Sequence, residues 1–309
     1  MSDPGAAAGF RSGFVTILGR PNAGKSTLLN ALAGAKLAIT SEKPQTTRTS
    51  IQGVVSMPDA QIVFIDTPGI HKADSAINRQ MMEAVRTALE DRDVLIFLVD
   101  AARDFGEADA HALDLVKKAG TPAILALNKI DLLRDKSRLL SLIDRYRGLH
   151  DFADYIPISA HTGENLEKLR QAIAALLPEG PAYFPAEHMT DQPERFLAAE
   201  LVREKILDET HEEVPHAVAV VVDKWEETPR LIRIFATIYV EKEGQKGILL
   251  GAGGSKLKRI GSRAREEMEK FFARKIFLDL HVKVHPGWRE ERQFLDALDW
   301  RTMAGKDDS

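Results

Sequence analysis

The chain has 309 residues, of which 44% are hydrophobic and 28% charged, a composition typical of a globular protein with enough apolar material for two domains. Cysteine is absent, which excludes disulfides and thiolate metal sites and suits a reducing cytoplasm. The net charge is −4 and no apolar run approaches the roughly 18 residues of a membrane span, so composition indicates neither a chain-wide basic surface for nucleic acid nor a transmembrane segment.

Short apolar runs alternate with helical patterns in the first half of the chain. The start of the chain lacks the basic end and long apolar stretch of a signal peptide, and we expect a flexible leader over 1–12. The alternation that follows, over 13–178, predicts a mostly parallel sheet with helices on both faces. The predicted strands are 13–19, 61–66, 93–100, 122–128 and 155–159. Ligands bind at the carboxyl ends of such strands, which is where the polar motifs stand.

The segment after the first predicted strand, GRPNAGKS at 19–26, fits the P-loop pattern G-x-x-x-x-G-K-[ST] and precedes a helical pattern. In this motif the glycines let backbone N–H groups surround a phosphate at a helix N-terminus. We expect Lys25 to reach the β- and γ-phosphates and Ser26 to bind Mg²⁺. The predicted phosphate-binding residues are Gly19, Arg20, Pro21, Asn22, Ala23, Gly24, Lys25, Ser26 and Thr27.

Two later segments complete the expected magnesium site. The polar, non-periodic segment 40–50 is interpreted as a switch loop that Mg²⁺ and the γ-phosphate order, with Thr47 as the magnesium-sensing residue and Thr46 as the second choice. The motif DTPG ends the next strand. There Asp66 is expected to hold Mg²⁺ through water, and the Gly69 N–H to meet the γ-phosphate.

The motif NKID, at 128–131, predicts guanine as the base. Guanine presents N1–H and N2–H₂ side by side, whereas adenine has an acceptor at N1, so a carboxylate at position 131 selects guanine. An unpaired buried polar group costs about 1–3 kcal/mol, which disfavours adenine. With SAHTG at the end of the fifth strand, the four motifs resemble those of the translation-factor-like GTPases and predict GTP and GDP as ligands. The predicted base-binding residues are Asn128, Lys129, Asp131, Ser159 and Ala160.

The residue after DTPG is Ile70, which cannot orient an attacking water as the glutamine of Ras-like enzymes does. We therefore expect slow intrinsic hydrolysis. GTPases that resemble this chain in PNxGKS are often stimulated by K⁺, so Asn22 is the candidate that binds this ion beside the phosphates; the alternative is a plain turn residue. The predicted catalytic residues are Asn22, Lys25, Thr47 and Gly69.

A proline-rich segment without periodicity, 179–193, is interpreted as a linker to a second domain over 194–300, with a tail over 301–309. This domain begins with a helical pattern and two strand-like runs, PHAVAVVVDKW and RLIRIFATIYVE. The loop GAGG, a basic helix to about Arg274, the strand KIFLDLHVKV and a short terminal helix near 289–299 follow. The pattern predicts a small α+β domain.

A local basic surface surrounds the GAGG loop. Residues 246–275 contain nine Lys and Arg against three Glu, a net charge of +6 in an otherwise acidic chain. A G-x-x-G loop beside such a surface is typical of a KH module, in which the loop backbone approaches single-stranded RNA. Ala252 and Gly253 occupy positions where a lysine is common in KH loops, which leaves Lys256 and Lys258 to compensate. The predicted RNA-binding residues are Ile248, Leu249, Gly251, Ala252, Gly253, Gly254, Lys256, Lys258 and Arg259.

The motifs GRPNAGKSTLLNAL, PQTTR, FIDTPGI, NKID, ISA and GQKGILLGAGGSKLKRIG stand in the order that characterises the Era family of bacterial GTPases, which this chain resembles. The resemblance runs from about Phe14 to Val284. It implies an α/β P-loop GTPase domain followed by an α+β type II KH domain. It also implies binding to a single-stranded segment near the 3′ end of small-subunit ribosomal RNA, a role in maturation of the small ribosomal subunit, and a cytoplasmic location with partial peripheral association with the cell membrane. A monomer is expected.

Two other interpretations remain open at this point. The chain is alternatively an RNA-binding chaperone whose nucleotide site is mainly structural. Ile70 is consistent with this alternative because it cannot orient an attacking water. A membrane-surface GTPase is the third interpretation, although no amphipathic basic helix stands apart from the predicted KH domain.

Overall fold

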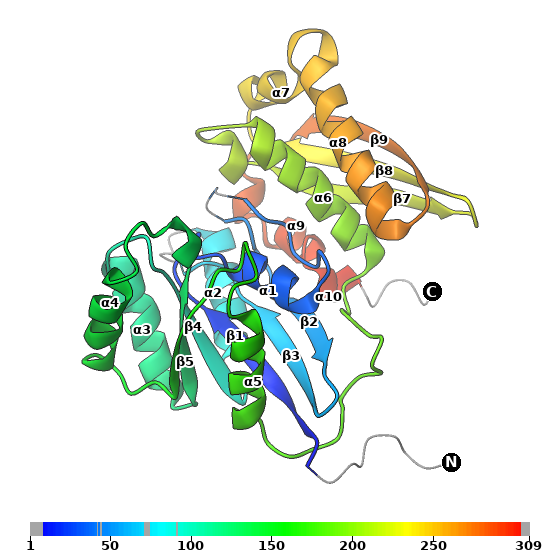
Figure 1. Ribbon diagram of the computed structural model, residues 1–309. Coiled ribbons are helices and arrows are strands. Elements are labelled where there is room, and N and C mark those ends of the chain that lie inside the picture. Colours follow the sequence, from blue (N-terminus) through cyan, green and yellow to red (C-terminus); the bar gives the residue numbers. More distant parts are fainter. Residues whose placement is uncertain (1–8, 42, 44, 71–74, 91, 304–309) are drawn as a thin grey trace, which may run out of the picture. The chain divides into compact units, whose positions relative to one another are not determined.

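The computed structural model describes residues 9–41, 43, 45–70, 75–90 and 92–303 (Figure 1). Contacts between residues group the chain into two compact units. The first comprises 1–38, 47–72 and 81–191, and the second comprises 39–46, 73–80 and 192–309. Most of the predicted leader and tail, residues 1–8 and 304–309, lies outside the described residues.

The first unit is built on a six-stranded sheet in the order β2-β3-β1-β4-β5-β6. All neighbouring strands are parallel except β2, which pairs antiparallel with β3. The five predicted strands are confirmed, and β2 was not predicted. The strands are β1 (Arg11–Leu18), β2 (Ile51–Ser56), β3 (Ala60–Asp66), β4 (Val94–Asp100), β5 (Ala123–Asn128) and β6 (Asp154–Pro157).

Helices cover both faces of this sheet, as predicted. One apolar cluster joins α1 and α5 to one face, and a second joins α3, α4 and the later part of α2 to the other. Every residue of β4 and β5 is buried, which explains why their sequences are almost continuously apolar. The helices are α1 (Lys25–Ala33), α2 (Ala76–Ala88), α3 (Glu107–Ala119), α4 (Arg138–Arg147) and α5 (Leu166–Leu176).

The second unit contains a three-stranded sheet in the order β7-β8-β9, with β7 antiparallel and β9 parallel to β8. Its elements follow the order α-β-β-α-α-β, with two short helices at the end; α7 was not predicted. They are α6 (Glu194–Glu209), β7 (Ala219–Glu227), β8 (Leu231–Val240), α7 (Glu243–Leu250), α8 (Ser255–Phe272), β9 (Lys275–Val284), α9 (Arg292–Ala297) and α10 (Trp300–Met303).

Helices α6 and α8 pack together on one face of this sheet (Figure 1). Helix α8 buries Ile260, Ala264, Met268 and Phe272, which recur every fourth residue and so form one stripe. Strand β8 buries alternate residues along its length, the period of a strand with one face on a core. None of the helices in the described part of the chain combines the length and hydropathy of a membrane span.

Candidate functional site

The P-loop connects β1 to α1 and is shaped by two glycines. A Cβ atom at Gly19 would lie 2.3 Å from the carbonyl oxygen of Leu98, so only glycine fits between the loop and β4. Gly24 has a φ of +99°, and a Cβ there would lie 2.4 Å from Nδ2 of Asn128. These close approaches leave the N-terminus of α1 facing the loop, which is the arrangement that binds a phosphate.

Three predicted magnesium-binding side chains converge at the start of α1. The Ser26 hydroxyl donates to Oδ2 of Asp66 at 2.8 Å and lies 2.8 Å from the Thr47 hydroxyl, which is 3.3 Å from the same Oδ2. Thr46, the second choice, hydrogen-bonds instead to the carbonyl oxygen of Lys43 at 2.6 Å. The geometry therefore favours Thr47 over Thr46 as the sensing residue.

The carboxyl of Asp66 is fully buried, and burial raises its pKa to about 6, although Lys25 and hydrogen bonds from Ser26 and Thr47 lower it. Burial also lowers the pKa of the Lys25 ammonium, which Asp66 opposes. The Lys25 Nζ donates to the carbonyl oxygens of Gly19 and Arg20, both at 3.2 Å. The Lys25 ammonium and the Asp66 carboxylate thus lie beside the P-loop, where the phosphates and Mg²⁺ are predicted to bind.

The residues present fit a magnesium ion. Two hydroxyls and one carboxylate are the oxygen donors that Mg²⁺ prefers, and Mg²⁺ usually takes its remaining ligands from water and substrate phosphates. The second carboxylate oxygen of Asp66, Oδ1, is buried and accepts no hydrogen bond from the described residues. A buried acceptor without a donor is costly, and a metal ion with its water shell removes that cost.

Two loops at the ends of β5 and β6 hold the residues predicted to bind the base. The Asn128 side chain donates to the carbonyl oxygen of Ala23 at 2.9 Å and accepts from the Ala160 N–H at 2.9 Å. The Ser159 hydroxyl donates to Oδ1 of Asp131 at 2.6 Å. Asn128 therefore ties the P-loop to the SAHTG loop, while Ser159 orients the carboxylate expected to select guanine.

Asp100, at the end of β4, is a supporting residue that the sequence analysis missed. Its Oδ2 accepts a hydrogen bond from Nζ of Lys129 at 2.9 Å and lies 3.7 Å from the Arg20 guanidinium. Arg20 also pairs with Asp109 at 3.1 Å. These charges fix the Lys129 stem, whose role beside the base was predicted, and anchor the start of the P-loop. No motif marks Asp100 in the sequence, since it only ends an apolar strand.

The DTPG segment packs directly on the P-loop. A Cβ atom at Gly69 would lie 3.0 Å from Cγ of Pro21, so glycine permits the contact. Ile70, the next residue, is buried in the core cluster on the α3 side of the sheet. Its apolar side chain is thus explained by packing, and it lacks any group that positions water.

The G-x-x-G loop joins α7 to α8 through a short 3₁₀ turn, η3 (Ala252–Gly254). Gly251, Gly253 and Gly254 have φ angles of +69°, +56° and +76°. A Cβ at Gly251 would lie 2.9 Å from that of Lys256, whereas nothing lies within 4 Å of one at Gly253. The glycine at 253, where a lysine is common, therefore suits the left-handed backbone, which disfavours side chains.

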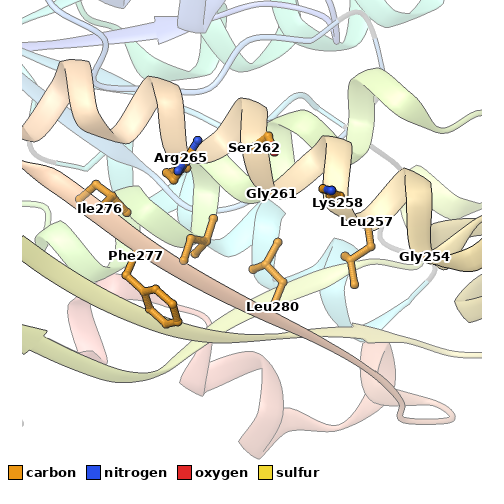
Figure 2. A pocket seen from close by; sticks show the side chains of 10 residues that line it. Gly254, Leu257, Lys258, Gly261, Ser262, Arg265, Ile276, Phe277 and Leu280 are labelled. Carbon is orange, nitrogen blue, oxygen red and sulfur yellow. The ribbon is translucent and has the colours of Figure 1, made fainter.

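A groove of about 610 Å³ runs between α8 and the edge strand β9 (Figure 2). Its floor is apolar, and Lys258 and Arg265 place cations along the α8 side (Figure 2). Most of the groove could not be predicted, because its lining residues on β9 belong to no motif. The lining residues are Gly254, Leu257, Lys258, Gly261, Ser262, Arg265, Ile276, Phe277, Leu278 and Leu280.

Of the predicted RNA-binding residues, only Gly254 and Lys258 line this groove. Leu249 has no exposed surface and packs in the core, so the prediction that its side chain binds RNA is wrong; its neighbour Ile248 is 43% exposed. Both lie in α7, where successive residues point in different directions. The Arg259 guanidinium pairs with Glu209 of α6 at 2.5 Å, and these hydrogen bonds hold the pKa of Glu209 below its ordinary value.

Comparisons with known protein families match each unit separately. The family described as "50S ribosome-binding GTPase" matches residues 14–129, and the family described as "KH domain" matches residues 213–289. These matches confirm the predicted fold class, an α/β P-loop GTPase domain followed by an α+β KH domain.

Relatives match almost the whole chain. GTPase Era of Syntrophus aciditrophicus is 52% identical over 296 residues, which are 95% of this chain and 96% of the relative. GTPase Era of Staphylococcus epidermidis is 46% identical over 289 residues, 93% of this chain and 96% of the relative.

Two solved structures have a TM-score of 0.91 and 39% identity to this chain, covering 94% of it and 99% of their own chains. One is a variant of Aquifex aeolicus Era bound to GDP·AlF4⁻. The other is Era in complex with MgGDPNP and nucleotides 1506–1542 of 16S ribosomal RNA. Both solved structures are therefore similar to this chain over the GTPase unit and the KH unit alike.

Proposed function

Because the chain belongs to the GTPase Era family, we propose that it is a GTP-hydrolysing switch that binds the 3′ region of small-subunit ribosomal RNA and assists assembly of the small ribosomal subunit in the cytoplasm. The observation that carries the proposal is the similarity, along 94% of the chain, to a structure that contains both MgGDPNP and a segment of 16S ribosomal RNA.

The nucleotide site supports GTP and Mg²⁺ as ligands. The P-loop backbone and Lys25 would hold the phosphates, and Asp131, oriented by Ser159, would accept from guanine N1–H and N2–H₂. Ser26, Thr47 and Asp66 would hold Mg²⁺, which neutralises charge that develops on the phosphates during hydrolysis. Thr47 and the Gly69 N–H would contact this region only in the triphosphate state and so distinguish GTP from GDP.

The intrinsic hydrolysis rate is expected to be low. Ile70 belongs to the core, and none of the predicted catalytic side chains is an acid or base placed to activate water. Asn22, with a φ of +61°, lies in the P-loop, where its amide oxygen would bind K⁺ beside the phosphates. A monovalent cation there would supply the positive charge that other GTPases take from an arginine finger.

The groove between α8 and β9 supports single-stranded RNA as the ligand of the second unit. Phosphates would follow the G-x-x-G loop, Lys256 and Lys258, and bases would enter the apolar groove. Edge strand β9 also leaves backbone donors and acceptors on the side away from β8, which suits hydrogen bonding to base edges.

Crosslinking of RNA to the full-length protein, followed by sequencing, tests this function. We expect one cluster of crosslinks in the 3′ region of small-subunit ribosomal RNA, stronger with a GTP analogue than with GDP. Arg265→Glu should weaken it at least about tenfold because it reverses a charge in the groove. Arg292→Glu, on α9, is the matched control because it makes the same charge change and does not line the groove. Crosslinks scattered over the RNA would overturn the proposal.

The rate of GTP hydrolysis distinguishes the proposed switch from the alternative, an RNA-binding chaperone with a mainly structural nucleotide. A switch predicts that the 3′ segment of small-subunit RNA changes the rate of GTP hydrolysis, whereas a purely structural nucleotide does not respond to RNA.

Association with the inner face of the cell membrane remains a prediction, for which liposome flotation is the measurement. The expected monomer is checked by light scattering.

A further inference from the structure

Part of the loop interpreted as a switch, residues 39–46, hydrogen-bonds to helix α6. Although residues 39–46 lie between α1 and β2 in the sequence, they cluster with the second unit. Within that unit, backbone groups of Thr40, Gln45 and Thr46 hydrogen-bond to two charged side chains of α6 that are buried with its apolar residues. The next residue in the chain is Thr47, which meets Ser26 and Asp66.

Arg203 of α6 holds the end of this segment. Its guanidinium is 2% exposed and forms a two-pronged pair with Glu200, at 2.7 Å and 2.6 Å. It also donates to the carbonyl oxygens of Gln45, at 3.3 Å, and Thr46. A buried guanidinium is stable only when its donors are used, and here two of its partners are backbone carbonyls immediately before Thr47.

Glu204 holds the beginning of the segment. Its carboxylate is 4% exposed and accepts from the Thr40 N–H at 2.9 Å. The other carboxylate oxygen accepts from Nζ of Lys205 at 2.6 Å. Adjacent residues of α6 thus bind the two ends of one short segment, which restricts where the segment can lead Thr47.

Lys205, which bonds to Glu204, also connects α6 to α8, the helix that lines the groove. Lys205 is also paired with Glu267 of α8. Helix α8 presents Lys258, Gly261 and Arg265 to the groove, while Glu267 contacts α6. A continuous set of contacts therefore runs from α8 through Lys205 and Glu204 to Thr40.

We propose that Arg203 and Glu204 are positioning residues for the nucleotide site: they hold both ends of segment 39–46 so that Thr47 reaches its place beside Ser26 and Asp66. The inference rests on the proposed function, because it takes Thr47 to serve the GTP-bound state. Since coupling between sites is reciprocal, binding of GTP and Mg²⁺ at Thr47 stabilises the contacts of α6, and a change at α6 alters affinity for GTP. GDP, which is held by the P-loop and base pocket, depends little on these contacts.

Nucleotide affinity and Mg²⁺ dependence in the full-length protein test the proposal. We expect Arg203→Met to weaken binding of a non-hydrolysable GTP analogue about tenfold and to raise the Mg²⁺ concentration for half-maximal hydrolysis similarly, within the range typical of coupling between sites. Affinity for GDP should stay within about twofold, which a general loss of structure would not spare. Arg203→Lys, which keeps a cation near the carbonyl oxygens, should recover part of the loss.

The matched control is Arg263→Met. Arg263 pairs with Asp208 and Glu209 of the same helix α6, and neither of these ion pairs involves segment 39–46. Its nucleotide affinities and Mg²⁺ dependence should match the wild type. If Arg203→Met does not fold, Glu204→Gln, which keeps the size of the side chain and weakens the link to Lys205, should give a smaller change in the same direction.

Two failures are distinguishable. Wild-type protein without Mg²⁺-dependent GTP hydrolysis would contradict the proposed function itself. A wild type that hydrolyses GTP, with Arg203 and Glu204 variants indistinguishable from Arg263→Met or equally weakened for GTP and GDP, would overturn only the positioning role.

Discussion

The side-chain oxygens of Ser26 and Thr47 lie 2.8 Å apart, although one belongs to the first turn of α1 and the other to the loop before β2. Both are within 3.3 Å of the buried carboxylate of Asp66. Because three separate segments meet at this point, we expect the conformation of the loop and ligand binding at the phosphate site to depend on each other.

Thr47→Ala is expected to raise the Mg²⁺ concentration needed for GTP hydrolysis at least about tenfold, a typical effect of altering a metal site. Thr46→Ala is the control, since the Thr46 hydroxyl bonds within its own segment. Measuring hydrolysis against Mg²⁺ concentration compares the two. Equal behaviour of both variants would show that Thr47 does not contact the metal.

Asp131→Asn should change the preferred base. An amide nitrogen can donate to the C2 carbonyl of xanthine, whereas the carboxylate pairs with the donors of guanine. We expect GTP affinity to fall about 5- to 150-fold, which corresponds to about 1–3 kcal/mol, and XTP affinity to rise. Asp135→Asn, in the exposed turn that follows, is the control. A retained preference for GTP in competition binding would refute the assignment.

Hydrolysis should be faster in KCl than in NaCl. Asn22 has a φ of +61°, so Asn22→Gly removes its amide without straining the backbone. This variant should lose the difference between the two salts while binding GDP normally. Equal wild-type rates in KCl and NaCl would eliminate the potassium site.

Adding a lysine to the G-x-x-G loop should strengthen RNA binding at one position only. Ala252→Lys adds a phosphate contact, so the salt dependence of log K should steepen by about 0.7. Gly253→Lys must place a side chain at a φ of +56°, which costs about 1–2 kcal/mol and offsets the added charge. Binding of a 3′ small-subunit RNA segment in a salt series measures both. A larger gain from Gly253→Lys would contradict this account of the loop.

The convergence of the nucleotide-binding motifs could be predicted because these motifs are short and stand at strand ends. Asp66 and Asn128 are the last residues of β3 and β5, and Lys25 and Asp131 follow β1 and β5 within a few residues, so the order of motifs also predicts their convergence. Strand β2 was missed because it follows a polar loop and lies at the sheet edge, where burial leaves a weak pattern.

Residues whose roles depend on tertiary partners could not be predicted. In the sequence, Arg203 and Glu204 resemble ordinary solvated charges of a helix, and nothing local shows that both are buried against a loop more than 150 residues earlier. Leu249 was assigned to the RNA surface because α7 was not predicted, and helical geometry instead turns this side chain into the core. Both cases depend on packing between distant segments rather than on local periodicity.

Asn128 has a consequence for protein engineering. Its single amide bonds the P-loop at Ala23 and the SAHTG loop at Ala160, and its Nδ2 occupies the space that a side chain at Gly24 would need. The base pocket and the phosphate cradle therefore cannot be exchanged between GTPases as independent modules. A redesign of base specificity that alters Asn128 would have to rebuild the P-loop at the same time.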